Sequence, residues 1–329
     1  MCNKKKVIID TDPGIDDSLA LMYALSSPEI DVIGLTIVSG NVPAKQGAKN
    51  ALKVLKFMNR LEIPVYLGAT TPLVREYVSA EDTHGLDGLG ESGIEEVEGN
   101  IYPDAANFIV KSLKKESGVS ILAIGPLTNI AQALQLDEKA FANLERLVSM
   151  GGNFKSHGNC SPVAEYNYWC DPDAAKYVYE QFEHLGKIVE MIGLDVTRKI
   201  VLTPNIVSYI KRLSPKKGAF VEKFIGFYFD FHWEYEKIIG CVINDPLAIA
   251  YFIEPSLCEG FLAYTTVETQ GICIGQSVTD EMNVWKKRPN SKVCIQVDAR
   301  AFMVSFIHRI FGGNEVEISS VLQQIMVQE

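Results

Sequence analysis

This 329-residue sequence lacks cysteine pairs, a surplus of positive charge and long apolar runs. No CxxC pair occurs, so we expect reduced thiols and a cytoplasmic location; the seven cysteines lie at positions 2, 160, 170, 241, 258, 273 and 294. A formal net charge of −10 argues against nucleic acid and anionic membranes as partners, because clustered Lys and Arg bind phosphate groups. A transmembrane helix needs about 18 uncharged apolar residues in a row, and no stretch provides them. The basic start precedes only three apolar residues, so we expect no signal peptide.

Short apolar runs alternate with amphipathic segments along most of the chain. The runs predict buried strands, at 7–9, 32–38, 64–68, 119–124, 147–150 and 188–194, with further strands within 261–298. The amphipathic segments predict helices, at 16–26, 43–59, 104–115, 130–136, 204–213, 220–235 and 299–311. This order predicts an α/β fold with an open, mostly parallel, Rossmann-like sheet, helices on both faces and a ligand site at the strand carboxyl ends. Because no linker or repeat interrupts it, we expect one domain over residues 1–329.

Four aspartates follow the first apolar run within eight residues: Asp10, Asp12, Asp16 and Asp17. A Pro-Gly turn separates the second from the third, and the last two fall in a first helical turn, where the helix dipole favours acids. Their mutual repulsion still exceeds what one helix end offsets, since each close pair costs on the order of 1 kcal/mol or more. We therefore expect a bound cation. Carboxylates around a sharp turn favour Ca²⁺ or Mg²⁺ over zinc.

Three other segments carry polar or aromatic side chains where a ligand can bind. Asn41 follows the second predicted strand, and the glycine-rich segment 79–99 is typical of a binding loop or lid. The aromatic helix 220–235 is more typical of a core. It leads directly to Asn244 and Asp245, however, so part of it can line a pocket for a flat ring.

The stretch from Asp10 to Asp17 resembles the DxDPGxDD signature of the nucleoside hydrolases, of the inosine-uridine preferring type, which cleave the N-glycosidic bond of ribonucleosides. Three later blocks resemble the same family in the right order: residues 125–131, 159–175 and 244–246. The resemblance covers nearly the whole chain. It implies a Ca²⁺-dependent enzyme that releases free base and ribose from a small ribonucleoside, and a homo-oligomer, either dimer or tetramer.

The resemblance also implies a role for each matching residue. Ca²⁺ would be held by three carboxylates and one carbonyl oxygen, those of Asp12, Asp17, Asp245 and Ile124. Asp12 would activate a water held by the ion, as in inverting glycosidases. Asp16 would accept from the ribose 2′-hydroxyl, and Asp10 would support the metal ligands. The other ribose hydroxyls would be held by Asn41, Asn159, Glu165 and Asn167, so that a 2′-deoxyribose would leave polar groups unpaired.

The sequence departs from the family pattern at the leaving base. Many members carry a His directly before the last Asp ligand, as the proposed acid, and this chain has Asn244, which cannot deliver a proton at neutral pH. Three substitutes stay open: His84 on the glycine-rich segment, His232 in the aromatic helix, or stacking of the base on Trp233 or Tyr235. A His before Gly at the position of His84 is frequent in the family and can contact base or ribose.

Two other functions compete with a hydrolase. Asp10 and Asp12 resemble the nucleophile motif of haloacid dehalogenase-type phosphatases, but the acids that follow add negative charge where a phosphate would bind. A catalytically impaired ribonucleoside- or ribose-binding protein of the same fold would explain Asn244, because all proposed metal and sugar positions are retained. Release of free ribose from a nucleoside distinguishes the hydrolase from this binding protein.

Overall fold

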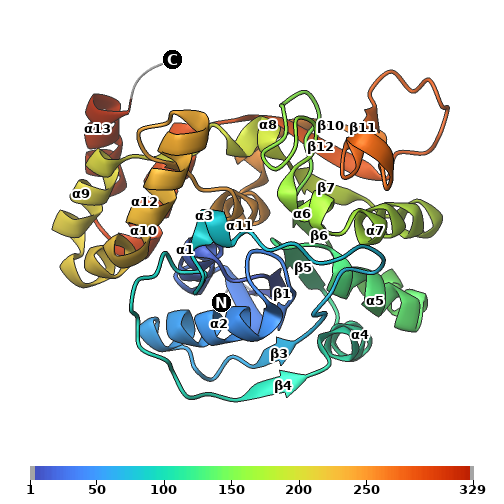
Figure 1. Ribbon diagram of the computed structural model, residues 1–329, viewed down its shortest axis with the longest axis horizontal. Helices are drawn as coiled ribbons and strands as arrows, with labels where there is room; N and C mark the ends of the chain where they lie inside the picture. The colour runs from blue at the N-terminus through green and yellow to red at the C-terminus, as the bar shows by residue number, and fades with distance from the viewer. Residues whose placement is uncertain (1–3, 327–329) are drawn as a thin grey trace.

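The computed structural model describes residues 4–326, and a ten-stranded sheet runs through it (Figure 1). Its strand order is β11-β10-β12-β7-β6-β5-β1-β2-β3-β4. The strands are β1 (Lys5–Thr11), β2 (Ile30–Ile37), β3 (Val65–Leu67), β4 (Ile101–Pro103), β5 (Val119–Ala123), β6 (Leu147–Met150), β7 (Val189–Ile192), β10 (Cys258–Val267), β11 (Ser277–Asp280) and β12 (Ser291–Val297). From β12 to β4 neighbouring strands are parallel, whereas β10 and β11 extend the sheet antiparallel. The predicted α/β fold with a mostly parallel sheet is confirmed.

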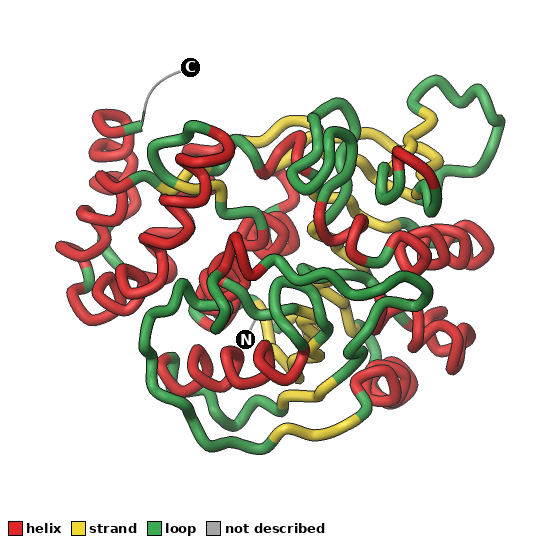
Figure 2. Tube along the Cα trace, viewed as in Figure 1, coloured by secondary structure: helices red, strands yellow, loops and turns green. Residues whose placement is uncertain are grey.

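Helices surround the strands (Figure 2). They are α1 (Ile15–Leu25), α2 (Ala44–Phe57), α3 (Glu81–His84), α4 (Ala105–Lys115), α5 (Thr128–Asp137), α6 (Tyr166–Cys170), α7 (Pro172–Leu185), α8 (Leu194–Thr197), α9 (Pro204–Leu213), α10 (Pro215–Glu236), α11 (Asp245–Ile253), α12 (Ala299–Phe311) and α13 (Glu315–Ile325). A small antiparallel pair, β8 (Val201–Leu202) and β9 (Cys241–Val242), joins the α8 and α10 regions. None of the described helices combines the length and apolar character that crossing a membrane requires.

The two faces of the sheet bury separate apolar cores. Val7 and Ile9 of β1 pack with α1, α2, α11 and α12, whereas Ile8 packs with α4, α5 and α7. Alternate side chains of a strand point to opposite faces, so burial on both sides accounts for the unbroken apolar run of β1. The apolar run is followed by Asp10 and Asp12, which are buried at the carboxyl end of the strand but belong to neither apolar core. The sheet therefore delivers the acidic motif to the edge where α/β proteins bind ligands.

The structure differs from the sequence predictions at short elements. β4 is an exposed three-residue edge strand and has no apolar run to announce it. α3 lies within the glycine-rich segment, and α6 (Tyr166–Cys170) lies within the block 159–175, at residues where we predicted no helix. Helices of four or five residues are too short for an apolar repeat to show. Cys2 lies outside the described residues, and the other six cysteines are free thiols.

Candidate active site

The four aspartates of the first motif lie where β1 ends and α1 begins, and all are buried. Asp17 is fixed most tightly. Its two carboxylate oxygens accept four hydrogen bonds, from the Thr11 hydroxyl at 2.5 Å, the Asp12 N–H at 3.2 Å, the Gly14 N–H at 3.0 Å and the Asn41 side-chain amide at 2.9 Å. Three of these donors belong to the motif itself, so the local chain conformation holds this carboxylate in place before any ligand binds.

Asp12 has one carboxylate oxygen held and one free. Its Oδ2 accepts the Asn41 N–H at 2.7 Å, whereas its Oδ1 is buried and has no hydrogen-bond partner in the described chain. Two glycines leave room for it, because a Cβ on Gly40 would lie 2.0 Å from Oδ2 and one on Gly125 would lie 2.5 Å from Oδ1. Burial, and then the charge of Asp17, raise the pKa of Asp12 well above its usual range. A buried carboxylate oxygen without a donor is suited to a cation.

Asp245 brings an acid from the far end of the sequence to this motif, at the start of α11. Carboxylate oxygens of Asp16, Asp17 and Asp245 lie within 4.8 Å of one another. The Asp245 carboxylate accepts no hydrogen bond from residues 4–326, and burial together with the charges of Asp16, Asp17 and Asp12 raises its pKa well above the usual value. Burial, followed by the charge of Asp16, raises the pKa of Asp17 to about 6. This all-oxygen cluster fits a hard divalent cation.

Ile124, the last predicted metal ligand, and Asp10, which was predicted to support the ligands, occupy different positions. Ile124 follows β5 and lines the cavity that contains Asp16 and Asp245, and its carbonyl oxygen accepts the Asn167 side-chain amide at 3.2 Å. Asp10, like Asp12 and Asp17, is not among the residues that line this cavity. Its Oδ2 accepts from Thr36 at 2.5 Å and from Asn129 at 2.8 Å, and burial raises its pKa to about 7.

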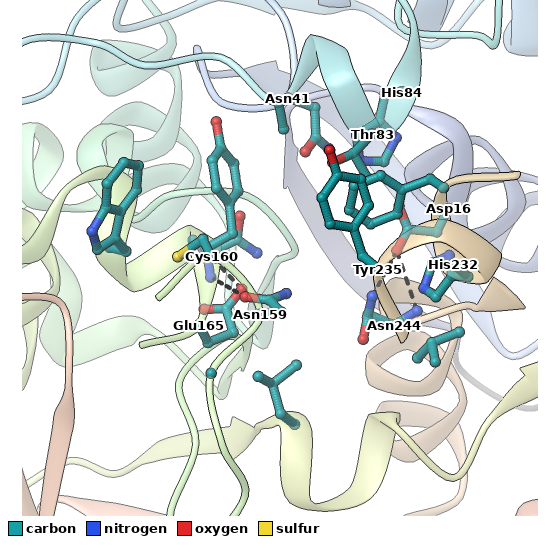
Figure 3. A pocket seen from close by; sticks show the side chains of 18 of the residues that line it. Asp16, Asn41, Thr83, His84, Asn159, Cys160, Glu165, His232, Tyr235 and Asn244 are labelled. Atoms are coloured by element: carbon teal, nitrogen blue, oxygen red, sulfur yellow. Dashed lines mark hydrogen bonds between the residues drawn. The ribbon is translucent and has the colours of Figure 1, made fainter. Parts of the chain in front are cut away.

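A cavity of about 560 Å³ lies above the acids and is bounded on the opposite side by polar side chains. Asn159 and Glu165 face Asp16 and Asn244 across it (Figure 3). The Glu165 carboxylate caps α6 by accepting the N–H groups of Asn167 at 2.8 Å and Tyr168 at 3.1 Å, and it also accepts the Gly152 N–H at 2.8 Å. Burial nevertheless raises the pKa of Glu165 to about 7.

The predicted sugar-binding residues all line this one cavity. Asn41 reaches it from the acidic side, and its backbone and side-chain amides hold Asp12 and Asp17. Asn159 accepts the Tyr166 N–H through Oδ1 at 2.9 Å, which leaves its amide nitrogen without a protein acceptor among the described residues. Donors and acceptors from the acidic side of the cavity and from the opposite side thus point into the same space, as recognition of a polyhydroxylated ring requires.

Two histidines and a tyrosine form one end of the cavity. His84 accepts the Ile15 N–H through Nδ1 at 3.1 Å, so its proton resides on Nε2, and burial lowers its pKa to about 4. His232 contacts the Tyr228 carbonyl through Nδ1 at 2.9 Å and must donate there, which leaves Nε2 free. Burial also lowers the pKa of His232. The Tyr228 hydroxyl donates to Asp16 Oδ2 at 3.3 Å, with its ring 5.3 Å from that of His84 and 4.5 Å from that of His232.

Helix α10 decides which aromatic residues reach the cavity. Tyr228, His232 and Tyr235 share one face of the helix and line the cavity, whereas Trp233 points elsewhere, is 52% exposed and lies beside Lys237. The expectation that Trp233 contacts the base is therefore corrected, because a residue next to His232 in sequence is turned about 100° away from it around the helix.

Asn244 occupies the position of the missing histidine. Its N–H and its side-chain amide both lie 3.2 Å from Asp16 Oδ2, and its own Oδ1 is buried with no partner in the described chain. In this structure Asn244 therefore orients Asp16.

Sequence reasoning did not single out Tyr228, Tyr166 or Arg198, which also line the cavity. Tyr228 stands one helical turn before His232, and that spacing could have identified it. Tyr166 adjoins Glu165 within a block that we had already selected. Arg198 pairs with Glu236 at 2.6 Å and donates to the Gly158 carbonyl at 3.0 Å, and no local pattern in the sequence announces it.

Comparisons with known proteins agree on one family. The family model described as "inosine-uridine preferring nucleoside hydrolase" matches residues 7–304. A probable uridine nucleosidase 2 of Arabidopsis thaliana is 34% identical over 94% of this chain and 98% of its own length. A pyrimidine-specific ribonucleoside hydrolase of Shigella flexneri is 32% identical over 91% of this chain and 95% of its own. The solved structure of a purine-preferring ribonucleoside hydrolase from Gardnerella vaginalis is 31% identical, with a TM-score of 0.87 over 96% of this chain and 100% of that one.

Proposed function

Because this chain belongs to the nucleoside hydrolase family, and is thus an N-glycosyl hydrolase of ribonucleosides, we propose that it works with Ca²⁺ and with Asp12 as the general base. The observation that carries this proposal is the acidic cluster opposite Asn159 and Glu165, with the buried Asp12 Oδ1 still unpartnered. A phosphatase of the haloacid dehalogenase type is excluded by the family match.

The metal would be held by the carboxylates of Asp12, Asp17 and Asp245 and by the carbonyl oxygen of Ile124. The donor set supports Ca²⁺, because all four ligands are oxygens and the residues that hold them are acidic and buried. When bound, the ion would orient the 2′,3′-diol of ribose and lower the pKa of a water molecule. The raised pKa values of Asp12 and Asp245 show how unfavourable these charges are in the protein alone.

Residues on both sides of the cavity would hold the ribose. Asp16, kept in place by Tyr228 and Asn244, would accept from the 2′-hydroxyl. Asn41, Asn159, Glu165 and Asn167 would bind the remaining hydroxyls. We expect ribonucleosides to be strongly preferred over 2′-deoxy analogues, because a buried acceptor without its hydroxyl partner is costly.

Cleavage of the C1′–N bond leaves positive charge on the ribose and negative charge on the base. Asp12 would remove a proton from the attacking water, while nearby carboxylates stabilise the developing charge on the sugar. His232 lines the cavity, and we assign it to protonate the base. Because its Nδ1–H is held by the Tyr228 carbonyl, a proton taken up from solvent would sit on Nε2, and the imidazolium would pass that proton to the base and return to its neutral form. His84 would donate a hydrogen bond from Nε2 while remaining neutral.

The histidine pair also bears on the alternative of an impaired binding protein. That alternative arose from Asn244, but the cavity supplies two histidines within reach of a base. The comparisons favour the hydrolase.

The decisive experiment is a substrate panel with and without a chelator. Purified protein would be incubated with inosine, uridine, adenosine and 2′-deoxyuridine, and free ribose would be measured. We expect ribose from at least one ribonucleoside, no reaction with deoxyuridine, and loss of activity in EDTA that Ca²⁺ restores better than Mg²⁺. Full activity after exhaustive chelation would refute the metal mechanism, and binding without ribose release would favour the impaired protein.

We extend three further expectations as proposals. The chain would form one domain over residues 1–329, reside in the cytoplasm and assemble as a homo-oligomer, either dimer or tetramer. Size-exclusion chromatography with light scattering tests the assembly.

A further inference from the structure

The cavity extends past the residues that we assign to ribose and base. Its lining includes Val78, Cys160, Tyr166 and Trp169, and none of these is assigned to contact the ribose or the base. They come from the segment before α3, from the loop before α6 and from α6 itself. In Figure 3, Cys160 lies beside Asn159 and Glu165, across the cavity from His232 and Tyr235.

The stereochemistry of ribose decides which part of a nucleoside would reach this region. The diol occupies C2′ and C3′, whereas the base on C1′ and the hydroxymethyl group on C4′ flank the ring oxygen from opposite sides. If the diol faces the acidic cluster and the base lies near His84 and His232, the C4′ substituent must point away from α10. It then points toward Cys160.

The walls of this region are fixed by contacts outside the cavity. The Tyr166 hydroxyl lies 2.7 Å from the Gly40 carbonyl oxygen and 2.8 Å from the Val78 carbonyl oxygen, and its single proton is shared between these two acceptors. The Arg75 guanidinium stacks on the Trp169 ring at 3.9 Å and donates to the Trp169 carbonyl at 2.5 Å. The Tyr166 and Trp169 rings are 6.3 Å apart. A ligand would therefore meet an aromatic surface that needs no reordering.

The chemistry of the region favours an uncharged ligand. Cys160 keeps exposed surface, but the protein around its thiol partly desolvates it. This partial burial raises the pKa of the Cys160 thiol, the charge of Glu165 acts in the same direction, and the thiol stays neutral. Arg75 is already engaged by Trp169, and Glu165 and Asp12 repel an anion. Aromatic rings and a thiol contact apolar or sulfur-containing groups favourably.

From these observations we propose that Val78, Cys160, Tyr166 and Trp169 form a subsite for an uncharged 5′ substituent, such as a methylthio group, on the nucleoside. This inference rests on the proposed function, because the position of the diol sets the direction of C4′. The protein would accept 5′-deoxy-5′-methylthio ribonucleosides as substrates and would reject 5′-phosphates. The reaction would be the same hydrolysis, giving the free base and 5-methylthioribose.

The test compares kcat/KM for 5′-methylthioinosine and 5′-methylthiouridine with kcat/KM for their parents, 5′-deoxyinosine and 5′-deoxyuridine, which lack the 5′-hydroxyl in the same way but carry no sulfur. We expect the methylthio nucleoside to exceed its parent at least about tenfold, and the 5′-monophosphate to retain less than about one thousandth of the kcat/KM of inosine or uridine. A methylthio-to-parent ratio below about ten for both bases would overturn the subsite.

A variant that fills the subsite localises the effect. Because Cys160 is exposed, Cys160→Trp is compatible with folding, and it should lower the methylthio-to-parent ratio at least about tenfold, whereas the matched Cys160→Ser should keep it. Val78→Trp probes the opposite wall and should act in the same direction. Equal losses on both substrates in both tryptophan variants would overturn the assignment. Calorimetric Kd values give the same ratio without turnover, so a protein that binds both nucleosides and hydrolyses neither refutes the proposed function and retains the subsite.

Discussion

The acidic end and the base end of the cavity are built in different ways. The acids at residues 10–17 are close in sequence, and backbone N–H groups of the same turn hold Asp17. The base end combines α3 and α10, which are distant in sequence, and its Tyr235 is 67% exposed. Relatives named for opposite base preferences share this fold. From this contrast we expect the local acidic motif to serve the proposed ion and sugar, and the side chains of α3 and α10 to select the base.

The largest effect should come from breaking the acidic end. We expect Asp12→Ala and Asp245→Ala to lower kcat by about 10³-fold or more, because each would remove a proposed cation ligand and the first would also remove the proposed base. Bound calcium, measured by calorimetry, should be lost as well. Asp31→Ala, at an exposed position of β2, is the matched control and should change neither. An Asp245→Ala enzyme with normal activity and calcium would contradict the predicted cluster.

The buried carboxyl groups around the cavity should dominate the pH dependence of stability, against a smaller contribution of opposite sign from His84 and His232, whose pKa values burial lowers. Burial raises the pKa of Asp17 to about 6 and those of Asp10 and Glu165 to about 7. Between about pH 4 and 7 the folded protein therefore binds more protons than the unfolded chain, so stability in EDTA should fall as pH rises. Calcium at about 100 times its Kd should restore about 2.7 kcal/mol at pH 8, seen as a higher Tm. A metal-free Tm that rises over this range would contradict the assignment.

The effect of substitutions at the base end should depend on whether the leaving group needs a proton. His232→Ala should lower kcat for uridine by about 10²-fold, because protonation of the base is lost. The effect should be small for 4-nitrophenyl riboside, whose phenolate leaves without a proton. The exposed His308→Ala serves as control. Asn244→His in the His232→Ala background should recover about tenfold, and equal losses on both substrates would mean that His232 is not the acid.

We expect the smallest effect from removing the hydrogen bond between the Tyr166 hydroxyl and the Gly40 carbonyl, which links the far wall of the cavity to the acidic end. Tyr166→Phe removes the hydroxyl that binds the Gly40 carbonyl, next to the Asn41 N–H that holds Asp12. One such hydrogen bond contributes about 0.5–1.5 kcal/mol, so kcat should fall by roughly 2- to 10-fold with little change in KM. Tyr102→Phe, at the exposed edge strand, is the control. A rise in KM alone would place Tyr166 in substrate binding rather than in positioning Asp12.

The sequence predicts the acidic end well because its information is local. The apolar run of β1, the Pro-Gly turn and the four acids are contiguous, so strand, turn and helix start follow from residue type alone. The parallel sheet follows from similar runs buried on both faces. Asp245 was reached through the family resemblance, since no local pattern ties it to residues 10–17.

The base end could not be predicted in the same detail. Which of Trp233 and Tyr235 reaches the cavity depends on how α10 packs, and that rotation is set by contacts with distant elements. The partner of Asn244 is Asp16, more than 200 residues earlier, and the tautomer of His84 depends on the N–H of Ile15. Such contacts between residues far apart in sequence form only on folding, so composition and periodicity cannot predict them.

Gly40 and Gly125 leave the space that the Asp12 carboxylate occupies. Mutational tolerance at these two positions should be as low as at the acids themselves, although neither supplies a reacting atom. A survey of variants that scores only ionisable groups would overlook them, and an engineer who wishes to retune this enzyme should leave both untouched while redesigning the far wall.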